Sequence, residues 1–233
     1  MLEVEDNLYM SNNRYDRLLE LSSFTPSDLE TLQCKKVLII GVGGVGQHVA
    51  TYLVTNGVEN LTLLDFDKVE ISNLNRQILL SEKDIGKYKV EVVKEALNAK
   101  NRDSHIEVID TKLDLSNVSE IITSKYDVVV DALDNWEGKF IISDECHKKH
   151  IPHLHVGVDG MAGQYCLFKD KCLRDVLPIE VLNEKRDGVM GSVVGSISAL
   201  ATTHLIQYLI GKEKPDQLFS LDFSNNSFKK VIL

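Results

Sequence analysis

KVLIIGVGGVGQHVATYLV, residues 36–54, is the stretch from which the fold can be inferred. It begins with an apolar run of strand length, Lys36–Ile40, and passes through Gly41, Gly43 and Gly46 into a helical pattern. Glycines at this spacing allow a tight turn, so that the N-terminus of a helix can approach a phosphate. The acidic residue expected to bind a ribose is Asp65, 19 positions after Gly46. The stretch predicts a nucleotide-binding site, with a purely structural glycine turn as the alternative.

The rest of the chain alternates buried strands with amphipathic helices. Strands are expected at Leu61–Leu64, Ile106–Ile109, Asp127–Val130, His153–Val158 and Gln164–Lys169, and helices at Asp28–Gln33, Lys87–Lys100 and Glu137–Lys149. Strands separated by helices indicate a parallel sheet that is covered on both faces. The last two strands, Leu218–Phe223 and Phe228–Leu233, form a hairpin. The predicted class is therefore α/β: a Rossmann-like, doubly wound, mainly parallel sheet with helices on both faces and a C-terminal antiparallel extension.

The division of the chain follows from the same patterns. Residues 1–35 are predicted to form peripheral N-terminal helices, with Ser27 and Glu30 as a capping box, and residues 36–233 a single domain. The apolar stretch Val189–Gly211 reaches membrane-spanning length, but its polar residues favour a buried helix.

Composition restricts the class of protein. The 233 residues carry a net charge of −9, with 43 % hydrophobic and 26 % charged residues, which is typical of a globular protein and unfavourable for coating a nucleic acid. The four cysteines form no CxxC pair, which argues against a disulfide framework or a cysteine zinc site. The acidic N-terminus does not resemble a signal peptide. We expect a cytoplasmic protein with no nucleic-acid or membrane partner.

Two cations favour a triphosphate over a dinucleotide. Arg76 and Lys89 follow Asp65 in a segment that a dehydrogenase would use as an ordinary connection. A triphosphate with a leaving pyrophosphate needs such charges, because they neutralise the charge that develops on it. The alternative is that both are solvated surface residues.

Four motifs, in order, carry a family resemblance. GVGGVG, LLDFDKVEISNLNRQILL, GKYK and DALDN resemble the ThiF/MoeB/HesA adenylyltransferases, relatives of ubiquitin-activating enzymes, from about Arg14 to Gly211. The resemblance implies ATP- and Mg²⁺-dependent adenylation of the C-terminal carboxylate of a small protein or peptide, with release of pyrophosphate. A weak carboxylate nucleophile makes orientation and charge neutralisation the main catalytic needs.

The resemblance also implies roles for individual residues. Those implied to bind ATP are Gly41, Gly43, Gly44 and Gly46 in the phosphate loop, Asp65 at the ribose, and Asn73, Gln77, Arg76 and Lys89 at the triphosphate. Asp134 is implied to bind Mg²⁺, with Asn135 adjacent. Arg17 matches an arginine that reaches the ATP of the partner subunit, which implies a homodimer. Helix capping is the alternative for Asp131 and Asp134, and we expect it for Asp131 only.

The chain also departs from this family. Most relatives bind structural zinc through two CxxC pairs, whereas here only Cys172 lies near the first pair, so we predict no zinc site. The position of a sulfur-transferring cysteine holds Glu184, which casts doubt on a thioester or persulfide step, and Cys172 is expected to be incidental. The histidine-rich run Cys146–His155 is not expected to bind metal, because its side chains divide between a helix end and a strand.

Two further features concern partners. The loop Asp170–Asp187 is predicted to be mobile and to form part of the path by which the substrate enters. Gly191, Gly195 and Ala199 recur every four residues, and such a stripe permits close helix packing either within the subunit or across a dimer interface.

The preferred function is adenylation of a small ubiquitin-like sulfur carrier of the thiamin or molybdopterin type. The alternative with the same chemistry is adenylation of a ribosomally made peptide for antibiotic-type modification. An NAD-binding oxidoreductase is disfavoured by Arg76, Lys89 and Asp134, and a tRNA-modifying dehydratase by the net charge of −9.

Overall fold

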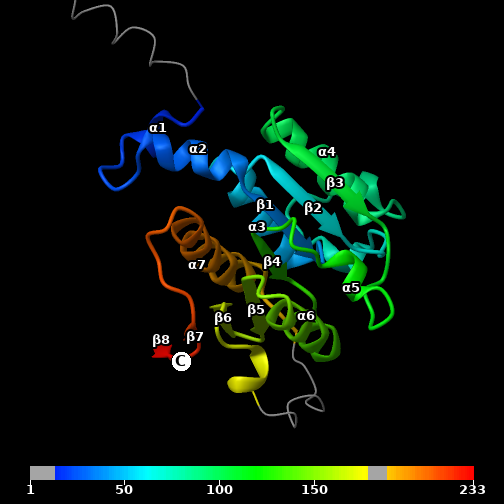
Figure 1. Ribbon diagram of the computed structural model, residues 1–233. Coiled ribbons are helices and arrows are strands. Elements are labelled where there is room, and N and C mark those ends of the chain that lie inside the picture. The colour runs from blue at the N-terminus through cyan, green and yellow to red at the C-terminus, as the bar shows by residue number, and fades with distance from the viewer. Residues whose placement is uncertain (1–13, 178–187) are drawn as a thin grey trace, which may run out of the picture.

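Eight strands form one mixed sheet in the computed structural model, which describes residues 14–177 and 188–233 (Figure 1). The strand order is β3-β2-β1-β4-β5-β6-β7-β8, and the first five of these strands are parallel. The bounds are β1 Lys36–Ile40, β2 Asn60–Leu64, β3 His105–Ile109, β4 Val128–Asp131, β5 His153–Asp159, β6 Ala162–Phe168, β7 Gln217–Asp222 and β8 Ser227–Ile232. Strands β6, β7 and β8 add to β5 in antiparallel register, which confirms the predicted α/β class with its antiparallel extension.

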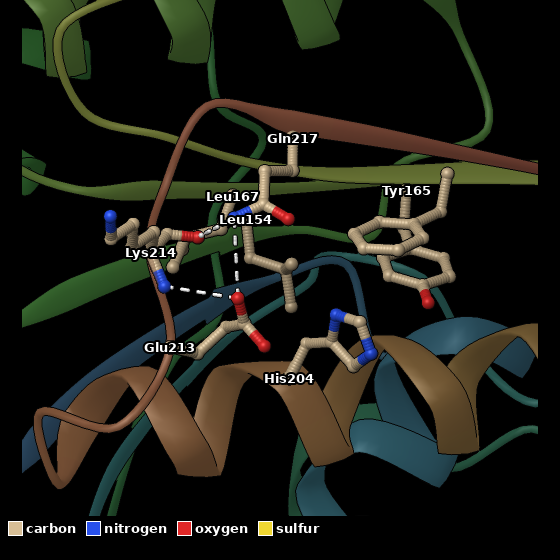
Figure 2. Close-up of a pocket in the computed structure, with 8 residues that line it drawn as sticks. Leu154, Tyr165, Leu167, His204, Glu213, Lys214 and Gln217 are labelled. Atoms are coloured by element: carbon tan, nitrogen blue, oxygen red, sulfur yellow. Dashed lines mark hydrogen bonds between the residues drawn. The ribbon is translucent and has the colours of Figure 1, made fainter. Parts of the chain in front are cut away.

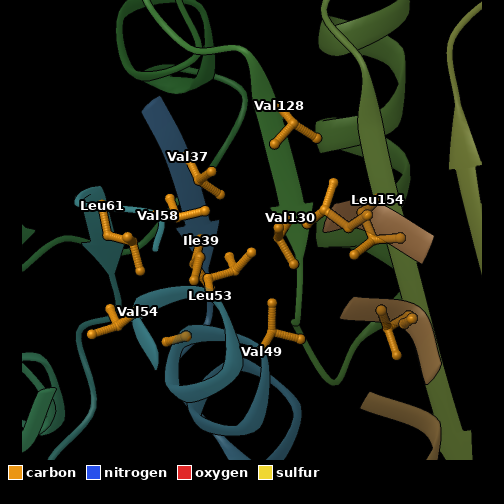
Figure 3. Packing of buried hydrophobic residues seen from close by; sticks show 14 of the residues in the cluster. Val37, Ile39, Val49, Leu53, Val54, Val58, Leu61, Val128, Val130 and Leu154 are labelled. Atoms are coloured by element: carbon orange, nitrogen blue, oxygen red, sulfur yellow. The ribbon is translucent and has the colours of Figure 1, made fainter. Parts of the chain in front are cut away.

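Helices cover both faces of the sheet. They are α1 Asp16–Leu19, α2 Pro26–Cys34, α3 Gly44–Thr55, α4 Lys89–Lys100, α5 Val118–Ile121, α6 Trp136–Lys148 and α7 Gly191–Leu209, with short 3₁₀ turns η1 Ile71–Asn73, η2 Glu82–Asp84 and η3 Leu173–Asp175. Side chains of a strand alternate between the two faces. Val37 and Ile39 therefore join the cluster under α2, α3, α4 and α7 (Figure 3), whereas Leu38 and Ile40 join a second cluster with α5 and α6. This alternation makes the sheet doubly wound.

The N-terminal helix α2 begins earlier than predicted. Its N-cap is Thr25, whose hydroxyl accepts from the Asp28 backbone N–H at 3.2 Å, while the Thr25 N–H donates to the Asp28 carboxylate at 2.6 Å. The prediction of Ser27 as the cap is wrong, because the helix already begins at Pro26. Proline is well tolerated there, since the first N–H groups of a helix have no partner within the helix. Leu29 and Leu32 of α2 join the main core, and the division at residues 35 and 36 stays a prediction.

The small residues of α7 pack within the subunit. A Cβ on Gly191 would meet the Asn75 carbonyl oxygen, and one on Gly195 would lie 3.1 Å from Nε2 of His48 on α3. Gly191 and Gly195 thus serve the packing of α7 against its own chain. Of the two interpretations, packing within the subunit therefore applies to these two positions. Within the two described stretches, no helix is long and apolar enough to cross a bilayer.

The segment after β6 is anchored as far as it is described. Arg174 makes a bidentate ion pair with Asp144 of α6 at 2.7–3.1 Å and stacks on Phe140, and Leu173 is fully buried. The rest of the predicted mobile loop, residues 178–187 with Glu184, lies outside the described residues.

Candidate functional site

A cavity of about 1800 Å³ opens at the carboxyl ends of the parallel strands, where open α/β sheets bind ligands. Every predicted site residue except Arg17 and Gly46 lines it. The ten that do are Gly41, Gly43, Gly44, Asp65, Asn73, Arg76, Gln77, Lys89, Asp134 and Asn135. Residues more than ninety positions apart are thus brought to one place by the fold.

The glycine loop is shaped by the turn that follows β4. Gly41 has φ of +92°, and a Cβ there would lie 2.8 Å from the Ala132 carbonyl oxygen. A side chain is therefore excluded on grounds of both conformation and space. Gly43 and Gly44 line the cavity, and α3 starts at Gly44, so the N-terminus of this helix lies at the cavity wall, where free backbone N–H groups favour an anion. Gly46 lies behind the loop, where a Cβ would collide with the Gly41 carbonyl oxygen, and we infer a packing role for it.

Asp65, at the end of β2, ties this loop to the sheet. Its carboxylate accepts from the backbone N–H groups of Val42 and Asp67, each at 2.8 Å. Burial raises the pKa of Asp65 above its ordinary value, and these two hydrogen bonds oppose the shift only in part. The carboxylate is thus held at the cavity wall by the backbone itself.

A glutamine that the sequence reasoning missed joins the loop to the next segment. Gln47 of α3 is fully buried, and its side-chain amide donates to the Val42 carbonyl at 2.9 Å and to Oε1 of Gln77 at 3.3 Å. Its own Oε1 accepts from the Leu79 N–H at 2.9 Å. A polar residue within the otherwise apolar start of α3 was the signal that could have revealed it.

Asn73 lies in the same segment as Gln77. It is 6 % exposed, and its Oδ1 accepts from the Glu70 N–H at 3.0 Å, which closes η1. Asn73 and Gln77 therefore reach the cavity from a segment fixed by internal hydrogen bonds.

The two predicted cations both line the cavity, and neighbouring groups hold each of them in place. Arg76 is half-buried and donates to the Ser72 carbonyl at 2.7 Å and to Oδ1 of Asn75 at 2.9 Å. The side chain of Lys89 is only 7 % exposed and forms an ion pair with Asp67 at 2.8 Å. Asp67, a second residue that the sequence reasoning missed, thus holds Lys89 in place at the cavity wall.

Asp134 contrasts with all of these groups. Its side chain is exposed and has no hydrogen-bond or ion-pair partner in residues 14–177 and 188–233. The next residue, Asn135, is the N-cap of α6 and accepts from the Gly138 N–H at 2.8 Å. Asp134 is therefore not the cap, and its carboxylate faces the cavity unpaired. A single carboxylate together with substrate phosphates is the way in which proteins usually bind Mg²⁺.

Asp131 was predicted to cap the same helix, and that prediction is wrong. Asp131 is fully buried and pairs with Lys139 of α6, whose ammonium group lies 3.1 Å from both carboxylate oxygens. Its Oδ2 also contacts Nδ1 of His155 at 3.0 Å. The geometry explains the error: Asn135, four residues later, is the one positioned to reach the first free N–H groups of α6.

Arg17 lies away from the cavity of its own chain. Its side chain is 91 % exposed and pairs with Glu20 at 2.7 Å on α1. Nothing in the described chain brings it to the other site residues.

The cysteines and histidines of the described residues are buried or scattered. Cys146 and Cys166 are buried, and burial raises the pKa of the Cys172 thiol, which makes it a poorer nucleophile. Among the residues described, no three His, Cys, Asp or Glu side chains are grouped so that they could hold a metal ion. His153 and His155 lie on β5 and face Asp131 instead.

A second cavity lies under α7 and is far smaller, at about 10 Å³ (Figure 2). His204 points from α7 toward the sheet, where its ring meets Tyr165 edge-on at 5.4 Å between centroids. Glu213 beside it accepts from the Lys214 N–H and the Gln217 amide. Such a volume holds about one water molecule, so the large cavity is the candidate site.

Comparison with known proteins identifies one family. The model of the ThiF family matches residues 15–233. A molybdopterin-synthase adenylyltransferase of Haemophilus influenzae is 35 % identical over 229 residues, which cover 94 % of this chain and 94 % of that protein. A probable molybdopterin-synthase adenylyltransferase of Gracilaria tenuistipitata var. liui is 32 % identical over 205 residues, which cover 85 % of this chain and 58 % of that protein.

Solved structures share the fold. MccB of E. coli in complex with ATP has a TM-score of 0.84 at 23 % identity and covers 96 % of this chain and 72 % of that one. MccB with AMPCPP and MccA gives a TM-score of 0.85 at 23 % identity, with the same coverage of 96 % and 72 %. At this identity the likeness shows the architecture, and it agrees with the predicted fold class.

Proposed function

This chain belongs to the ThiF family and is an ATP-dependent adenylyltransferase, and on that premise we propose that its acceptor is the C-terminal carboxylate of a small ubiquitin-like sulfur carrier. The family resemblance inferred from the motifs is thereby confirmed. The proposed reaction joins a carboxylate oxygen of the carrier to the α-phosphorus of ATP. The bond from that phosphorus to the bridging oxygen breaks, and pyrophosphate leaves, so that an acyl-adenylate remains.

The residues of the large cavity fit ATP. The positive φ of Gly41 and its close approach to Ala132 produce a loop that only glycine can form, with Gly43 and Gly44 lining the wall at the start of α3. We assign the phosphates to this loop and the ribose to Asp65. Arg76 and Lys89, with Asn73 and Gln77, would bind the triphosphate and stabilise the charge on the leaving pyrophosphate.

The single observation that carries the proposal is that one cavity joins these groups to Asp134 and to a second arm. Asp134 would hold Mg²⁺, which when bound supplies charge neutralisation at the phosphates. By the second arm we mean the part of the cavity that is lined by residues of β5, β6 and β7, among them Gly157, Gln164 and Ser220. We assign this arm to the extended C-terminal tail of the carrier.

The assembly and the compartment are also proposals. We propose a homodimer, because Arg17 cannot serve the cavity of its own chain in its position on α1. The free state of the four cysteines supports a cytoplasmic enzyme. No zinc site and no sulfur-transfer step are proposed.

ATP–pyrophosphate exchange with purified carriers tests the acceptor. We expect exchange with a carrier that ends in Gly-Gly, and none with the same carrier amidated at its C-terminus, because the amide removes the nucleophile. Silence with all such carriers but exchange with a short free peptide would contradict the proposal and support the peptide alternative, which the peptide-bound relative MccB favours.

A further inference from the structure

A buried ion pair lies directly behind the turn that carries Asp134. Lys139 is 2 % exposed and Asp131 is fully buried, so both charges are removed from water. Pairs of this kind contribute little stability compared with apolar residues of similar size, because desolvation offsets the attraction. A contribution to stability therefore explains this ion pair poorly, and its geometry indicates a different role.

Lys139 joins three elements through one ammonium group. It donates to both carboxylate oxygens of Asp131 at 3.1 Å and to the carbonyl oxygen of Val156 at 2.9 Å. These contacts connect α6, β4 and β5. His155, also on β5, contacts Oδ2 of the same carboxylate with its Nδ1 at 3.0 Å. The Asp131 side chain is thus held from several directions and cannot rotate without breaking them.

The clamped carboxylate in turn shapes the turn after β4. Its Oδ1 accepts from the backbone N–H of Leu133 at 3.2 Å, and the Ala132 N–H donates to the Ile40 carbonyl at 2.9 Å. Gly41 approaches Ala132 so closely that a Cβ on it would lie 2.8 Å from the Ala132 carbonyl oxygen. Asp134 comes next and, in the described parts of the chain, has no side-chain partner of its own. Its position therefore depends on the backbone of this turn.

We propose that Lys139 is a positioning residue that, by clamping Asp131, fixes the turn 131–134 and so sets where Asp134 presents its carboxylate to Mg²⁺. The inference rests on the proposed role of Asp134. Lys139 also lines the cavity, but its ammonium group is engaged by Asp131 and the Val156 carbonyl, so we assign it no direct contact with ATP or the metal. Residues that support a metal ligand in this way commonly change metal affinity by about 10- to 100-fold when they are replaced.

The neighbouring tryptophan supplies a readout that does not depend on turnover. Trp136 is the only tryptophan of the chain, lines the cavity and stacks on His155 with 5.9 Å between ring centroids. Its fluorescence should respond to ATP in the absence of any acceptor. ATP affinity can then be measured with Mg²⁺ and with EDTA, and the ratio gives the gain in affinity that the metal provides.

The main variant is the double substitution Asp131→Asn with Lys139→Met, which removes both charges and leaves no unpaired one buried. We expect it to fold and to bind ATP in EDTA as the wild type does, but to lose about 10- to 100-fold of the Mg²⁺-dependent gain. Lys139→Arg should keep most of the gain, because it keeps the clamp. Lys139→Gln is the second variant, to be used if the double variant does not fold. Its neutral amide keeps one hydrogen-bond donor group, so it should lose part of the Mg²⁺-dependent gain.

Lys149→Met is the matched control. Lys149 ends the same helix, pairs with Glu145 at 2.9 Å and donates to the Ser119 and Ile122 carbonyls, away from the cavity. It should lower the unfolding temperature and leave the Mg²⁺-dependent gain unchanged.

Asp134→Ala separates the two ways of failing. If it keeps the Mg²⁺-dependent gain, or if the wild type has none, the proposed function of Asp134 is wrong. If Asp134→Ala loses the gain while the double variant and Lys139→Gln keep it, the positioning role of Lys139 is overturned and the function of Asp134 stands.

Discussion

The two sides of the large cavity differ in how far their polar groups are engaged before a ligand binds. On the side of β1 and β2, Asp65, Gln77 and Lys89 are buried, and each has a partner within the chain. At the turn after β4, Asp134 is exposed and has no partner in the described residues. Arg17, which was also predicted to serve the site, lies outside the cavity. The first side is organised in advance, so it costs little reorganisation when ATP binds. We propose that the second is completed by the ligand or by another chain.

This difference gives a criterion for mutational data. Replacing a group on the organised side changes the hydrogen bonds of the folded chain as well as ATP binding. Replacing Asp134 or Arg17 removes no contact from the cavity wall, so activity should change while stability is nearly kept. The following predictions test this separation.

The largest effect is expected for Arg17 and Asp134 together. Arg17→Ala and Asp134→Ala should each lower ATP–pyrophosphate exchange by about 1000-fold, the usual worth of an arginine that stabilises phosphoryl charge. If Arg17 serves the partner subunit, mixed dimers of the two variants contain one intact site. After random reassortment, the mixture should regain about a quarter of the wild-type exchange.

Two results would contradict this arrangement. No recovery on mixing, with mixed dimers demonstrated by differential tagging, would place both residues in one chain's site. Loss of folding in Arg17→Ala would also break the comparison, because within residues 14–177 and 188–233 that side chain makes an exposed ion pair with Glu20 and is otherwise solvated.

Much of the fold follows from local pattern. KVLII predicted β1 residue for residue, because a continuous apolar run that leads into glycines fits only a buried strand here. The start of α2 was harder, because Thr25 and Ser27 are both good caps and only the structure shows that Thr25 reaches Asp28. Local sequence indicates that a cap exists, and backbone geometry selects the residue.

The sequence motifs predicted residues that line the cavity, but not the buried residues that hold them in place. The motifs gave Asp65, Lys89 and Asp134, which line the cavity. They did not give Gln47 or the pair of Asp131 with Lys139, since these side chains are buried and contact residues distant in sequence. Such contacts arise only when the strands assemble, so the sequence can mark Gln47 as an unusual polar residue in an apolar segment but does not show which groups it contacts.

An intermediate effect is expected at Lys89. Lys89→Met removes a buried ammonium group from the cavity wall and leaves Asp67, which is 48 % exposed and can be solvated. Exchange should fall by about 100-fold, because one charge on the leaving pyrophosphate is no longer neutralised. Thermal unfolding and exchange kinetics at varied ATP concentration measure the two consequences.

Lys87→Met is the matched control for Lys89. Lys87 pairs with Asp84 at 2.9 Å, is 55 % exposed and does not line the cavity. Its replacement should keep exchange within about twofold of wild type. Equal losses of exchange in the two variants would indicate a general effect of positive charge, and would contradict a specific role of Lys89 at the triphosphate.

The smallest effect concerns the pH dependence of Asp65. Burial raises the pKa of Asp65 above 3.8, so on acidification this carboxylate takes up a proton earlier than an ordinary aspartate. The protonated group is a weaker acceptor for the ribose, and Mg²⁺–ATP affinity should fall as the pH is lowered through this raised pKa. Asp65→Asn does not titrate, so the ratio of its dissociation constant to that of the wild type cancels the titration of ATP itself. That ratio should be roughly fivefold at neutral pH and approach one in acid.

Stability should move in the opposite direction, and this separates ligand binding from loop unfolding. Because the folded-state pKa of Asp65 is raised, the folded chain binds the proton more tightly than the unfolded chain does. The free energy of unfolding of the wild type, relative to Asp65→Asn, should therefore rise as pH falls through that pKa. If affinity and relative stability instead fell together, acid would be loosening the hydrogen bonds to Val42 and Asp67, and Asp65 would act through the loop alone. An affinity ratio that is independent of pH would remove Asp65 from the ribose site.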